Sequence, residues 1–336
     1  MGRFTVMSIV RYALFLIVGF GLPSVFPCCS DAYMSQRYPI ITDSIKALYE
    51  PLVGYCYSES LFNEEVLDDK DDGAARAEDC ETKPAEDANG GPFVAINPLT
   101  FLANGDCISK MAAIPDNSVD LILTDPPYNL GLFMKKRGTN LKQLRSNHFS
   151  GQGWDDLEFD EWTKQMDVFF KECHRVLKKR GNLIMFMSII KAETLISIAE
   201  NNKFYYKTVG IWHKTNPMPR NMNLHFINST ESWLYFVNDA NTGVFNNEGK
   251  PIHDFIETAT ISAKEHKNGN HPTQKPVALM KHFVDILSNP DGVVLDPFMG
   301  SGSTGMACKG SNRLFIGIEL SGEYYNNASI RLNESR

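Results

Sequence analysis

The sequence predicts an α/β fold in which a doubly wound, mostly parallel sheet carries helices on both faces. From residue 92 onward, short apolar runs alternate with segments whose apolar residues recur at helical spacing. This alternation is typical of parallel sheets, because parallel strands are joined by long crossover connections that usually contain a helix. Two of the apolar runs end in turns rich in proline or glycine, and ligands bind at the carboxyl ends of such strands.

The expected elements follow one another as short strands and longer helices. The clearest helix covers 162–176, where Trp162, Met166 and Phe169 lie at helical spacing. The run Lys178-Lys179-Arg180-Gly181 comes next, and cations followed by glycine are typical of a helix C-terminus. We expect further helices over 192–199, over 276–287 and from about residue 303, and strands over 121–124, 182–187, 205–213, 293–295 and 314–318.

The composition is that of an ordinary globular protein. The chain has 336 residues, of which 43% are hydrophobic and 22% are charged. These values exclude collagen-like, coiled-coil and fully disordered classes. The seven cysteines include no C-x-x-C pair, so we expect neither a zinc cluster nor a disulfide scaffold, and no metal site.

One acidic segment accounts for the negative charge of the chain. The formal net charge is −7, and residues 59–90 alone carry 12 acids and three bases. The remainder is balanced, so a nucleic-acid partner is not excluded. Residues 63–92 are rich in Asp, Glu, Ala and Gly, and we expect them to be disordered.

The first 91 residues are predicted to be an extension, separate from a domain at 92–336. Residues 4–26 are apolar and resemble a signal peptide or a short membrane anchor. The uninterrupted apolar run Tyr12–Val25 is short for a membrane-spanning helix, which needs about 20 residues. An upstream start codon, with the natural start at Met34, explains the same residues equally well.

A glycine-rich turn predicts a nucleoside-cofactor pocket. The stretch Asp296-Pro297-Phe298-Met299-Gly300-Ser301-Gly302-Ser303-Thr304-Gly305 contains G-x-G-x-x-G between an expected strand and an expected helix. Glycines let the backbone turn tightly and approach a ligand closely. Glu319 ends the next strand, where its carboxylate can accept both ribose hydroxyls. This pattern suits NAD, FAD or S-adenosylmethionine alike, and a turn needed only for packing is the structural alternative.

A second motif, Asp125-Pro126-Pro127-Tyr128, follows the expected strand 121–124. The prolines stop the strand and make a short, rigid loop. The Asp125 carboxylate and the Pro126 carbonyl are two neighbouring acceptors, and Tyr128 offers a flat face for stacking. This combination suits a planar heterocycle that carries an exocyclic NH₂ group.

With both motifs in place, the sequence resembles the amino DNA methyltransferases that act on adenine N6 or cytosine N4. The order, with the catalytic loop first and the cofactor loop near the C-terminus, resembles the circularly permuted β class of this family. The resemblance covers roughly residues 98–334. It rests on the two motifs and on three other stretches, Asn104-Gly105-Asp106-Cys107, Trp212-His213-Lys214-Thr215-Asn216-Pro217 and His271-Pro272-Thr273-Gln274-Lys275-Pro276.

The resemblance implies a Rossmann-like class I methyltransferase fold and direct methyl transfer from S-adenosylmethionine to a flipped-out base. No catalytic cysteine and no metal are required. The implied catalytic residues are Asp125, Pro126, Pro127 and Tyr128. The implied cofactor-binding residues are Asp106, Asp296, Phe298, Gly300, Gly302, Glu319, Thr273 and Lys275. For Lys275 the expected contact is the cofactor's carboxylate, with an exposed lysine at a helix start as the alternative.

The expected partner is double-stranded DNA. The segment 131–154 carries five cations and no acid, which suits phosphate contact, although a solvated loop is the alternative. The family places a small target-recognition insert at about 214–270. The candidate DNA-binding residues are Lys135, Lys136, Arg137, Lys142, Arg145 and Arg220.

The resemblance favours adenine N6 as the acceptor, because the catalytic loop begins with Asp, and cytosine N4 is the close alternative. A non-catalytic DNA-binding or membrane-anchored protein and an NAD dehydrogenase are more distant. A cytoplasmic, nucleoid-associated location is expected, and the apolar N-terminus leaves a signal or anchor open. A cognate restriction endonuclease and a homodimer are open as partners.

Overall fold

The structure, a computed structural model, describes residues 52, 92–97, 99–130, 157–219, 223, 226–261, 265 and 273–334. Apart from Leu52, the predicted extension lies outside the described residues. Residues 51–53 and 91–336 form one compact unit. Leu52 is fully buried, and its carbonyl accepts a hydrogen bond of 2.9 Å from the Phe93 N–H.

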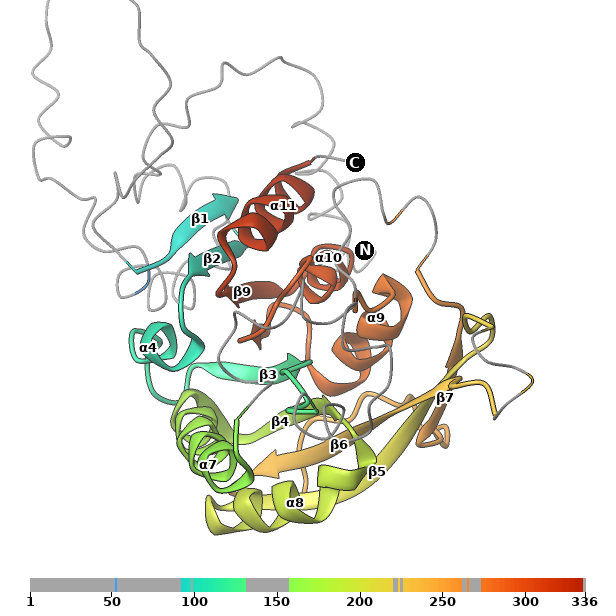
Figure 1. Cartoon of the computed structure of the whole chain (residues 1–336). Coiled ribbons are helices and arrows are strands. Elements are labelled where there is room, and N and C mark those ends of the chain that lie inside the picture. The colour runs from blue at the N-terminus through green and yellow to red at the C-terminus, as the bar shows by residue number, and fades with distance from the viewer. Residues whose placement is uncertain are drawn as a thin grey trace, which may run out of the picture. The chain divides into compact units, whose positions relative to one another are not determined.

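A nine-stranded mixed sheet forms the centre of the described part of this unit (Figure 1). The strand order is β1-β2-β9-β8-β3-β4-β6-β5-β7. The strands are β1 Val94–Asn97, β2 Thr100–Asn104, β3 Val119–Thr124, β4 Leu177–Met187, β5 Phe204–Lys214, β6 Thr230–Asn238, β7 Phe255–Thr258, β8 Val293–Asp296 and β9 Leu314–Glu319.

The middle of the sheet is parallel and its margins are mixed. Strands β2, β9, β8, β3 and β4 pair in parallel. Strand β6 then runs antiparallel to both β4 and β5, and β7 pairs in parallel with β5. The carboxyl ends of the central strands therefore meet at one edge, and the amino end of β6 lies at that same edge.

Helices cover both faces of the sheet, which confirms the predicted doubly wound α/β fold. Figure 1 shows α4, α7 and α8 on one side and α9, α10 and α11 on the other. The helices are α4 Cys107–Met111, α7 Phe159–Val176, α8 Ala192–Asn201, α9 Val277–Leu287, α10 Ser303–Lys309 and α11 Gly322–Asn333, with a short 3-10 turn, η2, at Ile189–Lys191. No helix among the described residues is both long enough and apolar enough to cross a membrane.

The cation-rich run after α7 differs from the prediction. The helix ends at Val176 as expected, but β4 already begins at Leu177 rather than at residue 182. Val119 pairs with Leu177 and Leu121 pairs with Asn182, so the four residues 178–181 lie opposite the single residue Asp120 and form an irregularity in the strand. Arg180, with φ of 68°, makes this turn of the backbone possible.

Candidate active site

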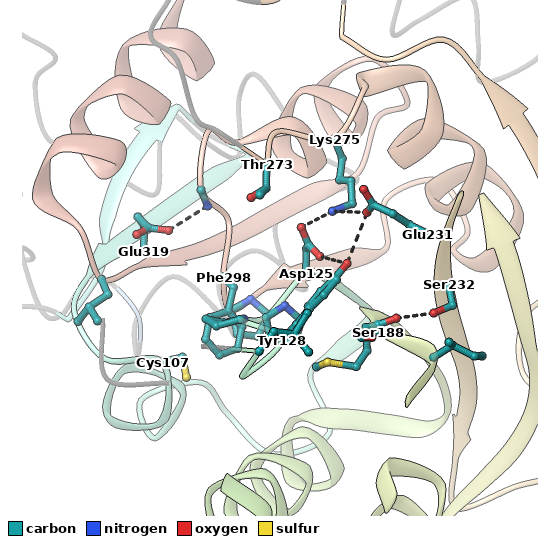
Figure 2. A pocket seen from close by; sticks show the side chains of 18 of the residues that line it. Cys107, Asp125, Tyr128, Ser188, Glu231, Ser232, Thr273, Lys275, Phe298 and Glu319 are labelled. Carbon is teal, nitrogen blue, oxygen red and sulfur yellow. Dashed lines mark hydrogen bonds and ion pairs between the residues drawn. The ribbon is translucent and has the colours of Figure 1, made fainter. Parts of the chain in front are cut away.

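The carboxyl ends of β3, β8 and β9 meet around one cavity of about 530 Å³ (Figure 2). The catalytic motif follows β3, the glycine-rich turn follows β8, and Glu319 ends β9. Met187 and Ser188, at the end of β4, and Glu231, at the start of β6, complete the opposite wall. The parallel middle of the sheet thus brings the two sequence motifs to one site.

Hydrogen bonds to the Asp296 side chain stabilise the glycine-rich turn. The Asp296 carboxylate accepts hydrogen bonds from the Thr304 hydroxyl at 2.6 Å and from the Phe298 N–H at 3.2 Å. Burial raises the pKa of Asp296 to about 7. Gly302 has φ of 76°, and a Cβ there would lie 3.1 Å from Leu332 of α11. Asp296 and Gly302 therefore shape the turn, and neither lines the cavity.

Glu319 and Asp106 present carboxylates to the cavity. One oxygen of Glu319 accepts the Gly300 N–H at 3.0 Å and the other accepts the Ser321 N–H at 2.8 Å. Burial raises the pKa of Glu319. Asp106 caps α4, because its side chain accepts from the N–H and the hydroxyl of Ser109, both at 3.0 Å. The other predicted cofactor residues on the cavity wall are Phe298, Gly300, Thr273 and Lys275.

The catalytic motif turns its polar groups toward a cluster of charges. The Tyr128 hydroxyl donates to Asp125 Oδ1 at 3.0 Å, and Lys275 Nζ pairs with Asp125 Oδ2. Pro126 and Pro127 also line the cavity. Figure 2 shows Asp125, Tyr128, Lys275 and Glu231 pointing toward one another.

Glu231 belongs to the same cluster. Its Oε2 lies 3.2 Å from Lys275 Nζ and 3.5 Å from the Tyr128 hydroxyl oxygen. Its Oε1 lies 2.5 Å from Lys214 Nζ, at the end of β5. Two carboxylates and two ammonium groups therefore form one cluster that is largely shielded from solvent, and their formal charges cancel.

The pKa values in this cluster follow from burial and from the neighbouring charges. Burial raises the pKa of Asp125 despite the opposing effect of Lys275. The pKa of Glu231 is lowered, because Lys275 and Lys214 outweigh its burial. Burial lowers the pKa of Lys275, but Asp125 and Glu231 together leave it raised. Lys275 is therefore a cation over a wide pH range.

The known proteins most informative about this site are DNA methylases. The DNA methylase family matches residues 119–330, which is more than half of the chain. The chain belongs to this family. It is thus a DNA methyltransferase, as the two motifs and their order predicted, and not an NAD dehydrogenase.

Two curated relatives share most of this DNA methylase's domain. The type II methyltransferase M.HinfI of Haemophilus influenzae is 35% identical over 254 residues, covering 70% of this chain and 69% of M.HinfI. The DNA adenine methyltransferase YhdJ of Escherichia coli strain K12 is 29% identical, covering 68% of this chain and 81% of YhdJ.

Solved structures agree with the fold. The M1.HpyAVI–SAM complex has a TM-score of 0.55 and 29% identity, covering 70% of this chain and all of that one. The cytosine-N4-specific PvuII DNA methyltransferase has a TM-score of 0.56 at 18% identity, covering 70% and 87%. At 18% identity, the similarity to the PvuII enzyme supports the fold alone.

Sequence reasoning missed Glu231 and gave Lys275 a different contact. Glu231 lies at the amino end of β6, a strand that the sequence analysis did not predict. Its signal is the run Trp233-Leu234-Tyr235-Phe236-Val237, which begins two residues after Glu231. The structure pairs Lys275 with Asp125 and buries it, so the alternative of an exposed lysine at a helix start is wrong, and its contact with the cofactor's carboxylate stays a prediction.

The predicted DNA-binding residues all lie outside the described residues. They are Lys135, Lys136, Arg137, Lys142, Arg145 and Arg220. The described chain stops at Leu130 and resumes at Leu157. Asn129 joins the two sides, because its side chain donates to the Leu157 carbonyl at 3.1 Å and accepts the Leu157 N–H at 3.0 Å.

Proposed function

We propose that this DNA methyltransferase transfers the methyl group of S-adenosylmethionine to N6 of adenine in DNA. The observation that carries the proposal is that Asp125-Pro126-Pro127-Tyr128 and the Gly300/Glu319 turn line one cavity. Membership of the DNA methylase family supports DNA as the substrate, and similarity to the DNA adenine methyltransferase YhdJ supports adenine.

The cavity wall fits this cofactor. Each oxygen of Glu319 accepts one backbone N–H, so each keeps a lone pair for a ribose hydroxyl. Gly300 lets the backbone reach the cavity with no side chain in the way, and the Phe298 ring supplies an apolar wall. Glu319, Asp106, Gly300 and Phe298 would therefore hold it. When bound, S-adenosylmethionine supplies an electrophilic methyl group on its sulfonium.

The residues after β3 act on the acceptor base. The lone pair of an exocyclic amine is delocalised into the ring, which makes the amine a poor nucleophile. Asp125 and the Pro126 carbonyl can each accept one of its protons, and this favours a pyramidal nitrogen with a free lone pair. The Tyr128 ring lines the same cavity and can stack on the base, which offsets part of the few kcal/mol needed to flip it from the duplex.

The first test is transfer of a labelled methyl group from S-adenosylmethionine to unmodified DNA, followed by digestion to nucleosides. The expected product is N6-methyladenine. Recovery of N4-methylcytosine would move the enzyme to the sister specificity. DNA without label from an enzyme that binds the cofactor would refute the proposal.

Replacement of Asp125 tests the assigned chemistry. Asp125→Ala removes an acceptor at the reacting amine, so the transfer rate is expected to fall by about 10²–10³-fold or more. Cofactor affinity, measured by calorimetry, should stay within a few-fold of wild type and serves as the control for folding. Retained activity would contradict the role of Asp125.

The cellular setting follows from the substrate. We place the enzyme in the cytoplasm with the DNA that it modifies, and we assign phosphate contact to the cations of 131–154. A cognate restriction endonuclease and a homodimer stay predictions.

A further inference from the structure

Both carboxylate oxygens of Asp125 are already engaged by groups of the protein. Lys275 pairs with Oδ2 and the Tyr128 hydroxyl donates to Oδ1. The side chain of Lys275 is only 6% exposed, and its Nζ also lies 5.0 Å from the centre of the Phe186 ring. A carboxylate has about four lone-pair positions, so Asp125 can still accept a proton from a substrate amine. The orientation of the Asp125 carboxylate, however, is set by its hydrogen bonds with Lys275 and Tyr128.

Glu231 contacts both donors at once. A single oxygen, Oε2, lies 3.2 Å from Lys275 Nζ and 3.5 Å from the Tyr128 hydroxyl. The other oxygen is held by Lys214 at 2.5 Å. Because β6 is antiparallel to β4, the first residues of β6 reach this edge of the sheet. Glu231 thus contacts Lys275 and Tyr128, the two side chains that orient the Asp125 carboxylate.

We propose that Lys275 and Glu231 are positioning residues of the methyl transfer: Lys275 keeps Asp125 ionised and aimed at the reacting amine, and Glu231 holds Lys275 and Tyr128 in place. This inference rests on the proposed function. It assigns to Lys275 a contact other than the cofactor's carboxylate, which was the sequence-based expectation.

The electrostatics of the cluster give the two residues opposite effects on Asp125. Burial disfavours the charged carboxylate, and only an ionised Asp125 offers its full set of acceptor positions. The positive charge of Lys275 stabilises that ionised form, whereas the negative charge of Glu231 opposes it. The groups that face Asp125 are Lys275 before α9, Glu231 of β6, Tyr128 of its own loop and Asp296 at the end of β8, with Lys214 of β5 behind Glu231.

The test measures single-turnover methyl transfer to DNA as a function of pH in the full chain, for wild type, Lys275→Met and Glu231→Gln. Removal of the Lys275 charge should shift the acid limb of the rate profile to higher pH. Removal of the Glu231 charge should shift it to lower pH. Both variants should also lower the plateau rate about 10- to 100-fold, because the Asp125 carboxylate is no longer held in the orientation that the reacting amine needs. The affinity for S-adenosylmethionine should change less than about three-fold in both.

Matched controls separate these shifts from a general effect of the substitutions. Lys164→Met on α7 and Glu193→Gln on α8 change the same residue types at exposed positions and should leave the profile unchanged. In the double variant Lys275→Met/Glu231→Gln, the loss of plateau rate should be smaller than the product of the two single losses, because each partner already acts through the other.

Three results would overturn the inference. The first is an unchanged acid limb in both variants. The second is a shift in the same direction in both. The third is a Lys275→Met enzyme with weakened cofactor affinity and a normal profile, which would place Lys275 at the cofactor. Glu231→Gln is nearly isosteric, so if Lys275→Met does not fold, the acid limb of the Glu231→Gln profile alone tests the inference. Wild-type enzyme that does not methylate adenine would instead refute the proposed function.

Discussion

At the scale of single residues, the two aspartates at the carboxyl ends of the neighbouring strands β3 and β8 are stabilised in different ways. Asp125 lies beside a buried cation, whereas Asp296 accepts hydrogen bonds from neutral donors, among them the Thr304 hydroxyl and the Phe298 N–H. Neutral donors compensate a buried charge less than an ammonium group does. Burial accordingly raises the pKa of Asp296 to about 7, so this carboxyl group titrates near neutral pH.

Asp296 should therefore make the stability of the enzyme depend on pH. Its pKa is higher in the folded than in the unfolded chain, so its contribution is complete in acid and is lost as pH rises through about 7. Asp296→Asn cannot ionise. The free energy of unfolding in urea should fall by about 2–4 kcal/mol less between pH 5 and pH 8 in this variant than in wild type.

The exposed Asp160→Asn on α7 is the control for this prediction and should follow wild type at both pH values. An equal fall in stability for Asp296→Asn and wild type would show that Asp296 is ionised at little cost in the folded enzyme.

At the scale of elements, the approach of β5 to β6 depends on one glycine. A Cβ at Gly210 would lie 2.0 Å from Cζ2 of Trp233 and 2.5 Å from the Asp254 carbonyl oxygen. The Trp233 ring packs at this place between β5 and Phe283 of α9, with 5.1 Å between the two ring centres. Since Trp233 follows Glu231 by two residues, this packing also sets where β6 enters the active site.

Gly210→Ala should displace the Trp233 ring and destabilise the fold. The expected loss is about 2–3 kcal/mol in the free energy of unfolding, with a changed tryptophan fluorescence and a lowered rate of methyl transfer. Gly310→Ala is the matched control, because a Cβ there meets its nearest atoms at 3.6 Å. A Gly210→Ala enzyme as stable as the control would show that Trp233 moves aside freely.

The elements that the sequence predicted and those that it did not differ in physical character. Strands such as 121–124 and 293–295 were predictable because buried parallel strands are continuous apolar runs bounded by turn residues. The short edge strands β1 and β7 bury few side chains, so their pattern is weak. Strand β6 is strongly apolar, but nothing local shows that it runs antiparallel.

The sequence predicted the motifs at the ends of parallel strands but not the side chains that approach them from other elements. The structure brings the motifs at the carboxyl ends of β3, β8 and β9 to one cavity, as expected for parallel strands, although Asp296 and Gly302 do not line it. Glu231 could not be placed without the direction of β6. The pairing of Lys275 with Asp125 joins positions 150 residues apart, and no spacing within either motif indicates it.

At the scale of the whole molecule, charge is distributed in opposing blocks along the chain. Residues 59–90 are acidic, whereas 131–154 carry only cations, and the enzyme as a whole has a net charge of −7. A protein with this net charge gains little from long-range attraction to DNA. Binding should then depend on local cations, each of which releases counterions from the phosphates it contacts.

Replacement of Lys135, Lys136 and Arg137 by Ser tests this assignment. The slope of log affinity for DNA against log salt concentration should become shallower by about 2–3, because each lost phosphate contact contributes about 0.9. A triple replacement of Lys164, Lys171 and Lys203, which are exposed in the structure, should leave the slope unchanged. Equal slopes for the two triple variants would remove 135–137 from the DNA-binding surface.

The hydrogen bonds of Asn129 have a consequence for engineering. They join the chain just after the catalytic loop to Leu157, 28 positions later, just before α7. The two sides of the intervening sequence are thus held at a fixed separation by a residue that is itself buried. A replacement segment grafted between Leu130 and Leu157 keeps this junction when Asn129 and Leu157 are retained, which makes these positions splice points for chimeras that exchange the segment to which we assign phosphate contact.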